Sequence, residues 1–324
     1  MIDDGITALL IAAFLDYLIG DPTTFPHPVQ VMGKLISFFT EILINLTKNP
    51  LMRRLGGVFL GGGLIFGSGA VVWGLIELTK AVSPLLSFSL EVILLASCFA
   101  GRSLRQAAIA VLTPLKKNEI ATARTQLSYY VGRDTDNLSS TEISRAVLET
   151  VAENTTDGVT APLFYALLGL FIPSIGSVPL VMAYKAASTL DSMVGYQRDP
   201  WTEIGWFSAK FEDRLTWVPC RLTVLTIGLM ARQPLKVWQV CRRDATQDPS
   251  PNAGWSECAY AVVLGVQLGG KNTYQGVVKE KPLLGNPEQP ITEASIEQAL
   301  TLTRICFLSW LLLGGGLKAV FSFL

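Results

Sequence analysis

Charged residues are scarce in this chain. They make up 16% of its 324 residues, whereas half of the residues are hydrophobic. Soluble domains carry roughly 25% charged residues, so the composition disfavours a soluble globular protein and favours a lipid bilayer as a partner. The 26 basic residues equal the 26 acidic residues in number, which leaves a net charge of zero. Because binding to nucleic acid needs an excess of positive charge, we expect no nucleic-acid partner.

Motifs built on thiols, imidazoles or glycine-rich loops are equally few. The five cysteines never occur in C-x-x-C spacing and there is a single histidine, which argues against a zinc site or a disulfide framework. No Gly-x-Gly-x-x-Gly fingerprint occurs. Residues 265–271 come close to a phosphate-binding P-loop, but Asn272 stands where serine or threonine is needed and no strand pattern precedes the run. We therefore expect no Walker-type nucleotide site.

Long hydrophobic segments are present instead, near residues 5–20, 55–79, 85–101, 158–194 and 302–324. Residues 55–76 carry no charge and would reach roughly 33 Å as a helix, enough to cross a ~30 Å hydrocarbon core. Within this segment, Gly57/Gly61 and Gly63/Gly67 repeat at a spacing that lets another helix approach closely. The sequence predicts an all-α, polytopic integral membrane protein with a single membrane domain over residues 1–324.

The polar segments between these stretches are rich in basic residues, at about 102–157 and 195–300, which predicts a cytoplasmic location for them. The stretch 158–194 contains Pro162, Pro173 and Pro179. We predict a proline-broken helical hairpin that turns near 172–177 and returns the chain to the side it left. Residues 222–231 form an uncharged run too short to span, which we expect to be interfacial or packed within the protein.

The charged residues gather before the hairpin. Ser139 and Glu142 form the pattern of a capping box, so a helix should begin near residue 140. On it Arg145, Glu149 and Glu153 recur every four residues and share one face. A solvated ladder of salt bridges is one interpretation.

The residues that follow this face favour a second interpretation. Asn154 and Asp157 come next, and the helix then enters apolar sequence, where acids are costly unless they are used. Carboxylates near a phosphate substrate typically hold Mg²⁺. The alternatives of a ladder and a metal site remain open at this point.

Other polar residues stand where they could bind phosphate. Arg133 lies beside a glycine, and its planar guanidinium matches phosphate oxygens, although a surface turn is equally compatible. Lys185, Thr189 and Asp191 follow the apolar segment, and a lysine there could also simply snorkel to the interface. If the hairpin forms, Lys185 and Asp191 should return to the membrane face that holds Glu153.

Two proline-rich loops carry further polar side chains. Residues 20–28 contain Asp21 and the single histidine, His27, and residues 248–254 contain Asn252. Flanking prolines fix the backbone, which preorganises a loop for binding but also terminates a helix. Both loops are candidate substrate-binding segments.

Taken together, these runs resemble the adenosylcobinamide-phosphate synthase family of cobalamin biosynthesis, the CobD/CbiB membrane proteins. Two positions depart from the family's usual pattern: Ser188 stands in place of asparagine, and Asp248 in place of a common histidine. The matching runs occur in the family's order and cover nearly the whole chain, at 20–29, 132–135, 145 with 149–158, 161–164, 184–185 with 189–193, 249–254 and 268–270.

The resemblance implies an ATP-dependent carbon–nitrogen ligase of the inner (cytoplasmic) membrane, with its active site facing the cytoplasm. It would join a propionate carboxylate of adenosylcobyric acid, a corrinoid, to the amine of 1-amino-2-propanol phosphate or a related amino-alcohol phosphate. A carboxylate must be activated before it acylates an amine, most simply as an acyl phosphate from ATP. Mg²⁺ and fixed positive charge stabilise that transfer.

These requirements suggest roles for the candidate residues. The predicted catalytic residues are Glu153, Asp157, Lys185 and Asp191. The predicted metal ligands are Glu149, Glu153, Asp157 and Asp191. The predicted phosphate- or substrate-binding residues are Asp21, His27, Arg133, Arg145, Asn154, Thr189 and Asn252.

Two other functions compete with this one. A secondary transporter would also have broken helices and intramembrane charges, but the long polar segments and the lack of an internal repeat speak against it. A non-catalytic membrane sensor related to the family, such as the AmpE-like proteins, should lose the acidic set that this chain keeps. The sequence leaves open which amino alcohol is used, whether the chain forms a homo-oligomer, and whether it associates with other cobalamin-assembly enzymes.

Overall fold

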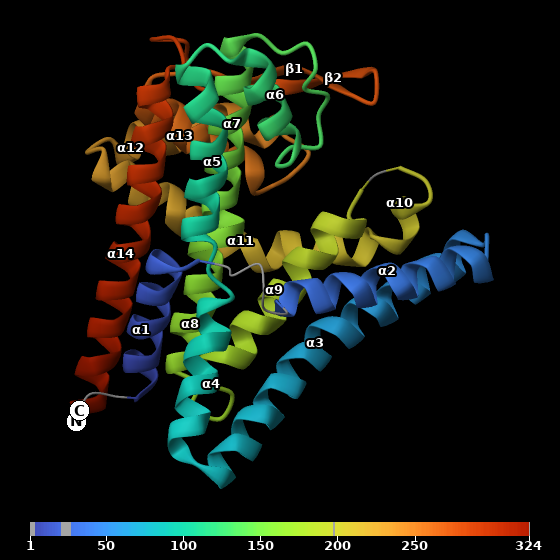
Figure 1. The fold of residues 1–324 in the computed structure, drawn as a ribbon, viewed down its shortest axis with the longest axis vertical. Coiled ribbons are helices and arrows are strands. Elements are labelled where there is room, and N and C mark those ends of the chain that lie inside the picture. The colour runs from blue at the N-terminus through green and yellow to red at the C-terminus, as the bar shows by residue number, and fades with distance from the viewer. Residues whose placement is uncertain (1–3, 21–26, 197, 324) are drawn as a thin grey trace. The chain divides into compact units, whose positions relative to one another are not determined.

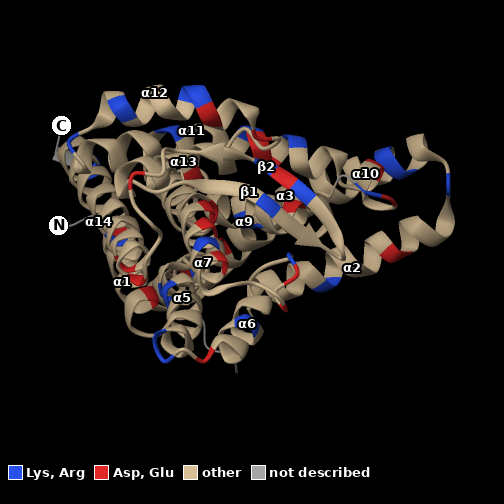
Figure 2. Ribbon diagram, turned by 90° about the horizontal axis from the view of Figure 1, so that it is seen from above, with Lys and Arg blue, Asp and Glu red and all other residues tan. Residues whose placement is uncertain are grey.

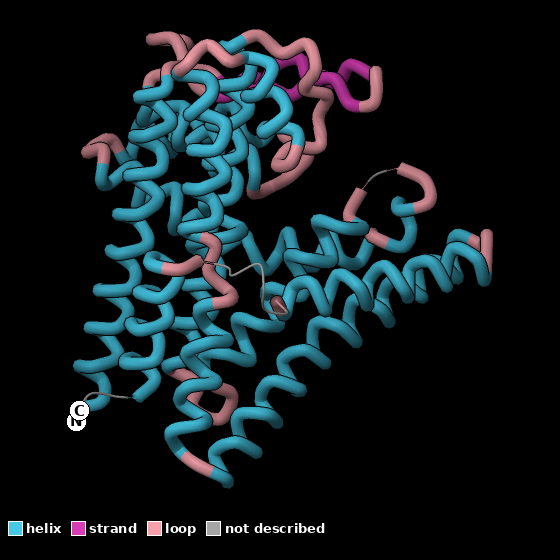
Figure 3. The backbone as a smooth tube through the Cα atoms, viewed as in Figure 1, coloured by secondary structure: helices cyan, strands magenta, loops and turns pink. Residues whose placement is uncertain are grey.

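The computed structural model describes residues 4–20, 27–196 and 198–323, and helices dominate it (Figures 1 and 3). Within these residues the only strands are β1 and β2, which pair as an antiparallel hairpin. The elements are α1 (Asp4–Leu18), α2 (Pro28–Leu46), α3 (Pro50–Val82), α4 (Pro84–Ala96), α5 (Gly101–Lys116), α6 (Ile120–Ser128), α7 (Ser140–Asn154), η1 (Thr155–Thr160), α8 (Ala161–Leu170), α9 (Ser177–Val194), α10 (Trp201–Ile204), α11 (Trp206–Met230), α12 (Pro234–Asp244), η2 (Ala245–Gln247), α13 (Ala253–Leu264), β1 (Leu268–Tyr274), β2 (Val277–Leu284) and α14 (Glu293–Phe323).

Four helical stretches are long and apolar enough to cross a membrane: Pro28–Leu46, Pro50–Val82, Pro84–Lys116 and Glu293–Phe321. They expose large apolar side chains, such as Phe59 and Leu313, which water would disfavour and lipid would accept. The predicted all-α, polytopic membrane class is therefore confirmed. The segments predicted near 5–20 and 158–194 form α1, α8 and α9, and none of these helices is among the four stretches.

The chain folds into two compact units. The first comprises Met1–Ala100, Ala161–Leu215 and Trp310–Leu324, and the second comprises Gly101–Thr160 and Thr216–Ser309. Each unit is thus assembled from segments far apart in sequence, and we describe each by itself.

The predicted hairpin is present in the first unit. Helices α8 and α9 pack against each other, and the chain turns between Leu170 and Ser177. Gly176 adopts a positive φ of 84° at this turn, and Ser177 Oγ donates to Ala166 O at 2.7 Å. Gly169 lies so close to the backbone of Gly176 and Ser177 that a Cβ atom would overlap it. The prediction of a hairpin turning near 172–177 is confirmed.

Helix α3 provides further close approaches in the first unit. A Cβ atom at Gly57 would overlap the backbone carbonyl of Ile204 in α10, and one at Gly61 would overlap the ring of Phe207. No atom of the described chain lies within 4 Å of a Cβ atom built at Gly63 or Gly67. The first glycine pair therefore receives a neighbouring segment within the chain, as predicted, whereas the second pair does not.

These two glycine pairs allow a matched test of packing. We expect Gly57→Ala to destabilise the first unit by ~1–3 kcal/mol, because the rigid carbonyl of Ile204 leaves no room for a methyl group. Gly63→Ala should be neutral or stabilising, since alanine favours a helix by ~1 kcal/mol over glycine and meets open space. Thermal unfolding in detergent micelles measures both, and equal effects of the two variants would contradict the close packing.

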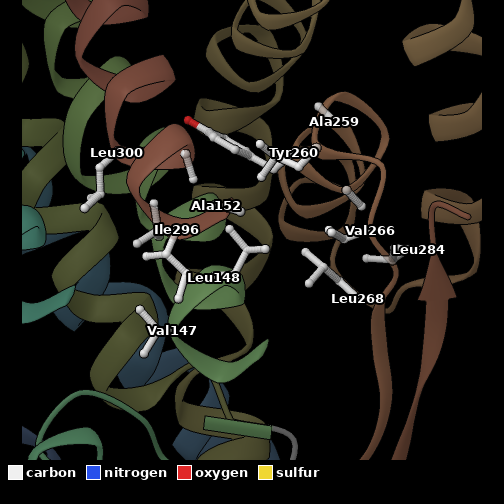
Figure 4. Close-up of a cluster of buried hydrophobic side chains, with 14 of the residues drawn as sticks. Val147, Leu148, Ala152, Ala259, Tyr260, Val266, Leu268, Leu284, Ile296 and Leu300 are labelled. Atoms are coloured by element: carbon white, nitrogen blue, oxygen red, sulfur yellow. The ribbon is translucent and has the colours of Figure 1, made fainter. Parts of the chain in front are cut away.

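The second unit has a continuous apolar core. Figure 4 shows part of it, with Leu148 and Ala152 of α7 beside Ile296 of α14 and Tyr260 of α13. Val224 and Ile227 of α11 are buried in the same core. One face of residues 222–231 is therefore packed in the core, whereas Leu222, Leu225 and Leu229 are exposed, so the run combines protein packing with an apolar face that an interface could cover.

A π-helix follows α7 at Thr155–Thr160. Such wide turns are rare and are frequently found at functional sites. Thr155 at its start has its hydroxyl 3.0 Å from the Tyr260 hydroxyl and 2.8 Å from that of Thr303, and all three side chains are buried. The π-helix is thus fixed to α13 and α14 by polar contacts, and it carries Asp157, one of the predicted site residues.

Candidate functional site

The helix that carries the acidic run begins as predicted. Ser139 caps α7, its Oγ accepting from Glu142 N at 3.3 Å, and Glu142 Oε2 accepts from Ser139 N at 2.7 Å. These hydrogen bonds lower the pKa of the Glu142 carboxyl. The cap fixes where α7 begins, and the four-residue spacing of Arg145, Glu149 and Glu153 places them one above another on a single face of this helix.

Glu149 is the centre of a buried ion pair with two arginines. Its side chain is only 2% exposed, with Oε2 2.5 Å from Arg133 Nη2 and Oε1 3.5 Å from Arg145 Nη1. Oε1 also accepts from Gly269 N at 2.9 Å. Both oxygens are thus engaged, and the structure gives Glu149 a positioning role. Its predicted role as a metal ligand stays a prediction that would require these contacts to change.

A bulge in the β-hairpin supplies the backbone partners of this ion pair. The register of β1 against β2 shifts between Leu268 and Gly270, and Gly269 has a φ of 83°. A Cβ atom at Gly269 would overlap Pro282 O, so only glycine fits this position. Its N–H donates to Glu149, and its carbonyl accepts from Arg145 Nη1. Residues 265–271, which resemble a P-loop in sequence, therefore lead from the end of α13 into the bulged strand β1.

Residues 132–135 bind the same hairpin from the side. Asp134 accepts from the backbone N–H groups of Gln275 and Gly276 at 2.9 and 2.8 Å, which closes the turn of the hairpin. Arg133 Nη1 donates to Asn272 Oδ1 at 2.8 Å, and Arg145 Nη2 donates to the same oxygen at 3.1 Å. Arg133 and Arg145 thus hold α7 and the hairpin together, and their predicted phosphate-binding roles stay untested. Figure 2 shows the acidic and basic residues on α7 and on the hairpin.

A second group of charges involves residues that the sequence analysis did not single out. Glu257 of α13 is fully buried, and its Oε1 lies 3.3 Å from Nζ of Lys281 on β2. Glu153, which is half-buried, interacts electrostatically with both residues, and so does Asp248. We call Glu153, Asp248, Glu257 and Lys281 the Lys281 cluster.

Burial and mutual repulsion control the ionisation of this cluster. Burial raises the pKa of the Glu257 carboxyl, Lys281 opposes the shift, and Glu153, Glu149 and Asp248 add to it. Burial likewise raises the pKa of Glu153. Burial alone would lower the pKa of Lys281, but the surrounding carboxylates outweigh it and raise the pKa. Acids with raised pKa values next to a retained lysine are typical of functional sites.

Asn252 contributes to a third polar arrangement in this unit. It is buried, and its Oδ1 accepts from Arg221 Nη1 at 3.1 Å. The Arg221 guanidinium lies 4.2 Å from the ring centroid of Trp255 and 5.1 Å from that of Trp217, so it contacts both rings in cation–π geometry. Arg221, which is fixed between these two rings, thus positions the Asn252 side chain, and the predicted role of Asn252 in binding substrate stays a prediction.

The other predicted residues near α7 are also placed. Asn154 is exposed, and its Nδ2 donates to Thr150 O at 2.9 Å. Asp157 is half-buried in the π-helix and interacts electrostatically with Cys220. One helical stretch of the second unit therefore carries five of the predicted residues: Arg145, Glu149, Glu153, Asn154 and Asp157.

The remaining predicted residues belong to the first unit. Lys185, Thr189 and Asp191 lie on α9, where Thr189 Oγ1 donates to Lys185 O at 2.6 Å. His27 caps the start of α2 through Nδ1, which accepts from Val29 N at 3.2 Å, and its predicted role in binding substrate stays a prediction. Asp21 lies outside the described residues. How Lys185 and Asp191 relate to the acidic run of the second unit stays a prediction.

Among residues 4–20, 27–196 and 198–323, no three acidic, histidine or cysteine side chains are arranged to hold a metal ion. The residues that the sequence analysis missed are Glu257, Lys281 and Arg221. Glu257 had a signal, because it is the one charged residue between Asp248 and Lys271 and so stands in an otherwise apolar run. Lys281 had none, since it lies in a Lys-Glu-Lys run that is typical of a solvated strand.

Comparison with known proteins decides the family. The sequence model described as CobD/Cbib protein matches residues 9–303. The chain belongs to the CobD/CbiB family. No solved structure matches it.

Relatives from several bacteria agree with this family over nearly their whole length. The chain is 54% identical to the cobalamin biosynthesis protein CobD of Synechocystis sp. over 303 residues, 94% of this chain and 89% of that protein. It is 43% identical to CobD of Halalkalibacterium halodurans, covering 98% of each chain. It is 41% identical to CbiB of Salmonella typhimurium, covering 92% of each. The resemblance predicted from the sequence is confirmed, and with it a role in cobalamin biosynthesis.

Proposed function

We propose that this CobD/CbiB protein is an ATP-dependent amide ligase that joins a propionate carboxylate of adenosylcobyric acid to the amine of an amino-alcohol phosphate, yielding adenosylcobinamide phosphate when the amine is 1-amino-2-propanol phosphate. The observation that supports it most is the Lys281 cluster, with its fully buried Glu257, in the same unit as the arginine-bound Glu149. A purely structural helix face has no need of several partly buried acids around one lysine, because each costs desolvation energy. A reaction that moves phosphate and protons does need them.

Mg²⁺ fits the donor chemistry of this unit. Glu153 is a partly buried carboxyl whose neighbours Glu257 and Asp248 are also acidic, and excess negative charge of this kind favours a divalent cation. Mg²⁺ uses one or two carboxylates and keeps several waters, so it needs no group of three acids. Glu153 and Asp157 are the residues that would hold it. When bound, Mg²⁺ would neutralise charge on the phosphates of ATP.

The residues of the chain itself would do the rest. Glu149 and the two arginines fix the hairpin on α7 and so fix the place of Lys281 relative to Glu153. The positive charge of Lys281 can then face a phosphate group while the acids accept protons or bind the cation. On α9, Lys185 and Thr189 remain candidates for a further phosphate contact.

We also propose that the polar segments face the cytoplasm of the inner membrane, since ATP and the corrinoid are found there and basic residues concentrate in these segments. Membrane vesicles test reaction and orientation together. Inside-out vesicles that contain the protein should form the amide, with equal release of phosphate or pyrophosphate, only when adenosylcobyric acid, amino-alcohol phosphate, Mg²⁺ and ATP are all added outside. Right-side-out vesicles should remain inactive, because ATP does not cross the bilayer.

Detergent-solubilised protein is the control, because it exposes both faces and should be active whichever way the protein is oriented. Amide formation in detergent together with activity of right-side-out vesicles alone would reverse the orientation. Binding of the corrinoid without any turnover in detergent would instead indicate a non-catalytic member of the family, and the proposed reaction would then be wrong.

A further inference from the structure

Glu257 buries a carboxylate oxygen that has no hydrogen-bond donor within the described residues. Its Oε1 pairs with Lys281 Nζ at 3.3 Å, whereas Oε2 has no partner although the side chain is 0% exposed. Leaving a buried carboxylate oxygen unpaired is costly, and buried polar atoms in folded proteins nearly always have a partner. An orphan of this kind points to a ligand that brings its own donor.

A second unpaired acceptor lies beside it. Asp248 Oδ1 accepts from Ser250 N, but Oδ2 is buried and has no partner within the described chain. The Asp248 side chain packs directly on α13, since a Cβ atom at Gly254 would lie 2.6 Å from Asp248 Cβ. Gly254 precedes Glu257 by three residues, and residues three apart share a helix face. The two orphan oxygens thus belong to adjacent acids on one side of α13.

The third acid comes from α7. Ser256 of α13 donates to Ala152 O at 2.5 Å and accepts from Thr156 Oγ1 at 3.0 Å. These contacts place Glu153, the residue after Ala152, and Glu257, the residue after Ser256, where the two helices meet. Glu257 is the carboxyl in contact with Lys281, whereas Glu153 and Asp248 interact with Lys281 electrostatically and Glu149 is already paired with two arginines. A cationic ligand that binds at Glu257 would therefore be attracted by these neighbouring acids as well.

We propose that Glu257 is the subsite for the primary ammonium group of the amino-alcohol phosphate, with Lys281 facing the phosphate of the same molecule. This inference rests on the proposed function. A primary ammonium has three donors and no acceptor, which matches two orphan acceptors on adjacent acids. The Lys281 side chain is 29% exposed and so lies at the edge of the cluster, where a phosphate can reach it from solvent. A zwitterion that carries one ammonium and one phosphate is complementary to this acid–lysine pair.

Calorimetry on the full-length protein in detergent tests the subsite, with 1-amino-2-propanol phosphate and propan-2-yl phosphate, which lacks the amine, as the two probes. We expect the parent protein to bind 1-amino-2-propanol phosphate about tenfold or more tightly than propan-2-yl phosphate, because only the first probe can form a charge-assisted hydrogen bond to a buried acid. Glu257→Gln should abolish this preference without changing the affinity for propan-2-yl phosphate. Lys281→Gln should weaken the binding of both probes.

Two further variants provide a control and a second test of the subsite. Glu280→Gln changes an exposed acid next to Lys281 and should preserve the preference. Asp248→Asn keeps the oxygen that caps Ser250 and should reduce the preference several-fold. The proposal is overturned if Glu257→Gln keeps the preference for the amine-bearing probe. It is equally overturned if the parent protein shows no such preference, and binding of Mg²⁺ alone to the parent but not to Glu257→Gln would then assign Glu257 to a cation. Either result leaves the proposed reaction intact if the parent protein forms the amide in the vesicle assay, so the two failures are distinguishable.

Discussion

Glu153→Gln is expected to abolish amide formation, lowering turnover by ~10² or more, because the amide keeps the shape of the side chain but can neither carry negative charge nor accept a proton. Asp157→Asn, one turn further along in the π-helix, should have an effect of the same order. Both acids are half-buried and lie where α7 gives way to the π-helix. The measurement is turnover of the purified variants at saturating ATP, corrinoid and amino-alcohol phosphate.

Glu119→Gln provides the matched control, since Glu119 is an exposed acid of the same unit whose side chain makes no capping hydrogen bond. It should retain the parent's turnover. All three variants should elute from gel filtration as the parent does, because each substitution preserves volume. Turnover of Glu153→Gln within a few-fold of the parent would reduce the acidic face of α7 to a ladder of salt bridges, the first of the two interpretations of the sequence.

Glu149→Gln is expected to destabilise the second unit by ~3–5 kcal/mol, because it leaves two buried guanidinium groups without a countercharge. Arg133 and Arg145 both depend on this carboxylate, and its side chain is almost completely buried. The buried cysteines of the chain report unfolding directly, since a thiol-reactive dye reaches Cys220, Cys241 and Cys258 only when the core opens. The midpoint of dye labelling on heating should fall by several degrees.

The ion pair of Lys236 with Glu288 is the control. Its atoms are 3.3 Å apart, but both side chains are about half exposed. Exposed pairs contribute ~0–1 kcal/mol, so Glu288→Gln should leave the midpoint nearly unchanged. Equal shifts for the two variants would show that the burial of Glu149 contributes nothing to stability.

Features that depend on neighbours in sequence could be predicted. The start of α7 follows from Ser139 and Glu142, the hairpin from its prolines, and the spanning helix α3 from its length without charge. Each is specified by residues within one or two turns, where propensity, capping and hydrophobic length act directly. The family was also visible, because its motifs are local runs that keep their order.

Features that depend on residues far apart in sequence could not be predicted. Arg133 and Asn272 are separated by 139 residues, and Arg145 and Gly269 by 124. Glycines at 269 and 270 resembled a nucleotide loop, but they have positive φ values at a bulge against β2, and the bulge contacts Glu149 and Arg145, which are far away in sequence. Glu257 stood out only as a lone charge in an apolar run, and nothing local indicated that Lys281 would pair with it.

The contacts of the Gly269 bulge also determine how late the second unit can finish folding during synthesis of the chain. Glu149 leaves the ribosome 120 residues before the backbone N–H that it accepts from, and Arg145 precedes its carbonyl partners by more than this. Until β1 has been synthesised, Glu149 and Arg145 lack some of the hydrogen-bond partners that they have in the folded protein, where burial without partners would be costly. The second unit is therefore completed late, and translation must pass the hairpin before α7 gains the partners that hold its charges in the interior.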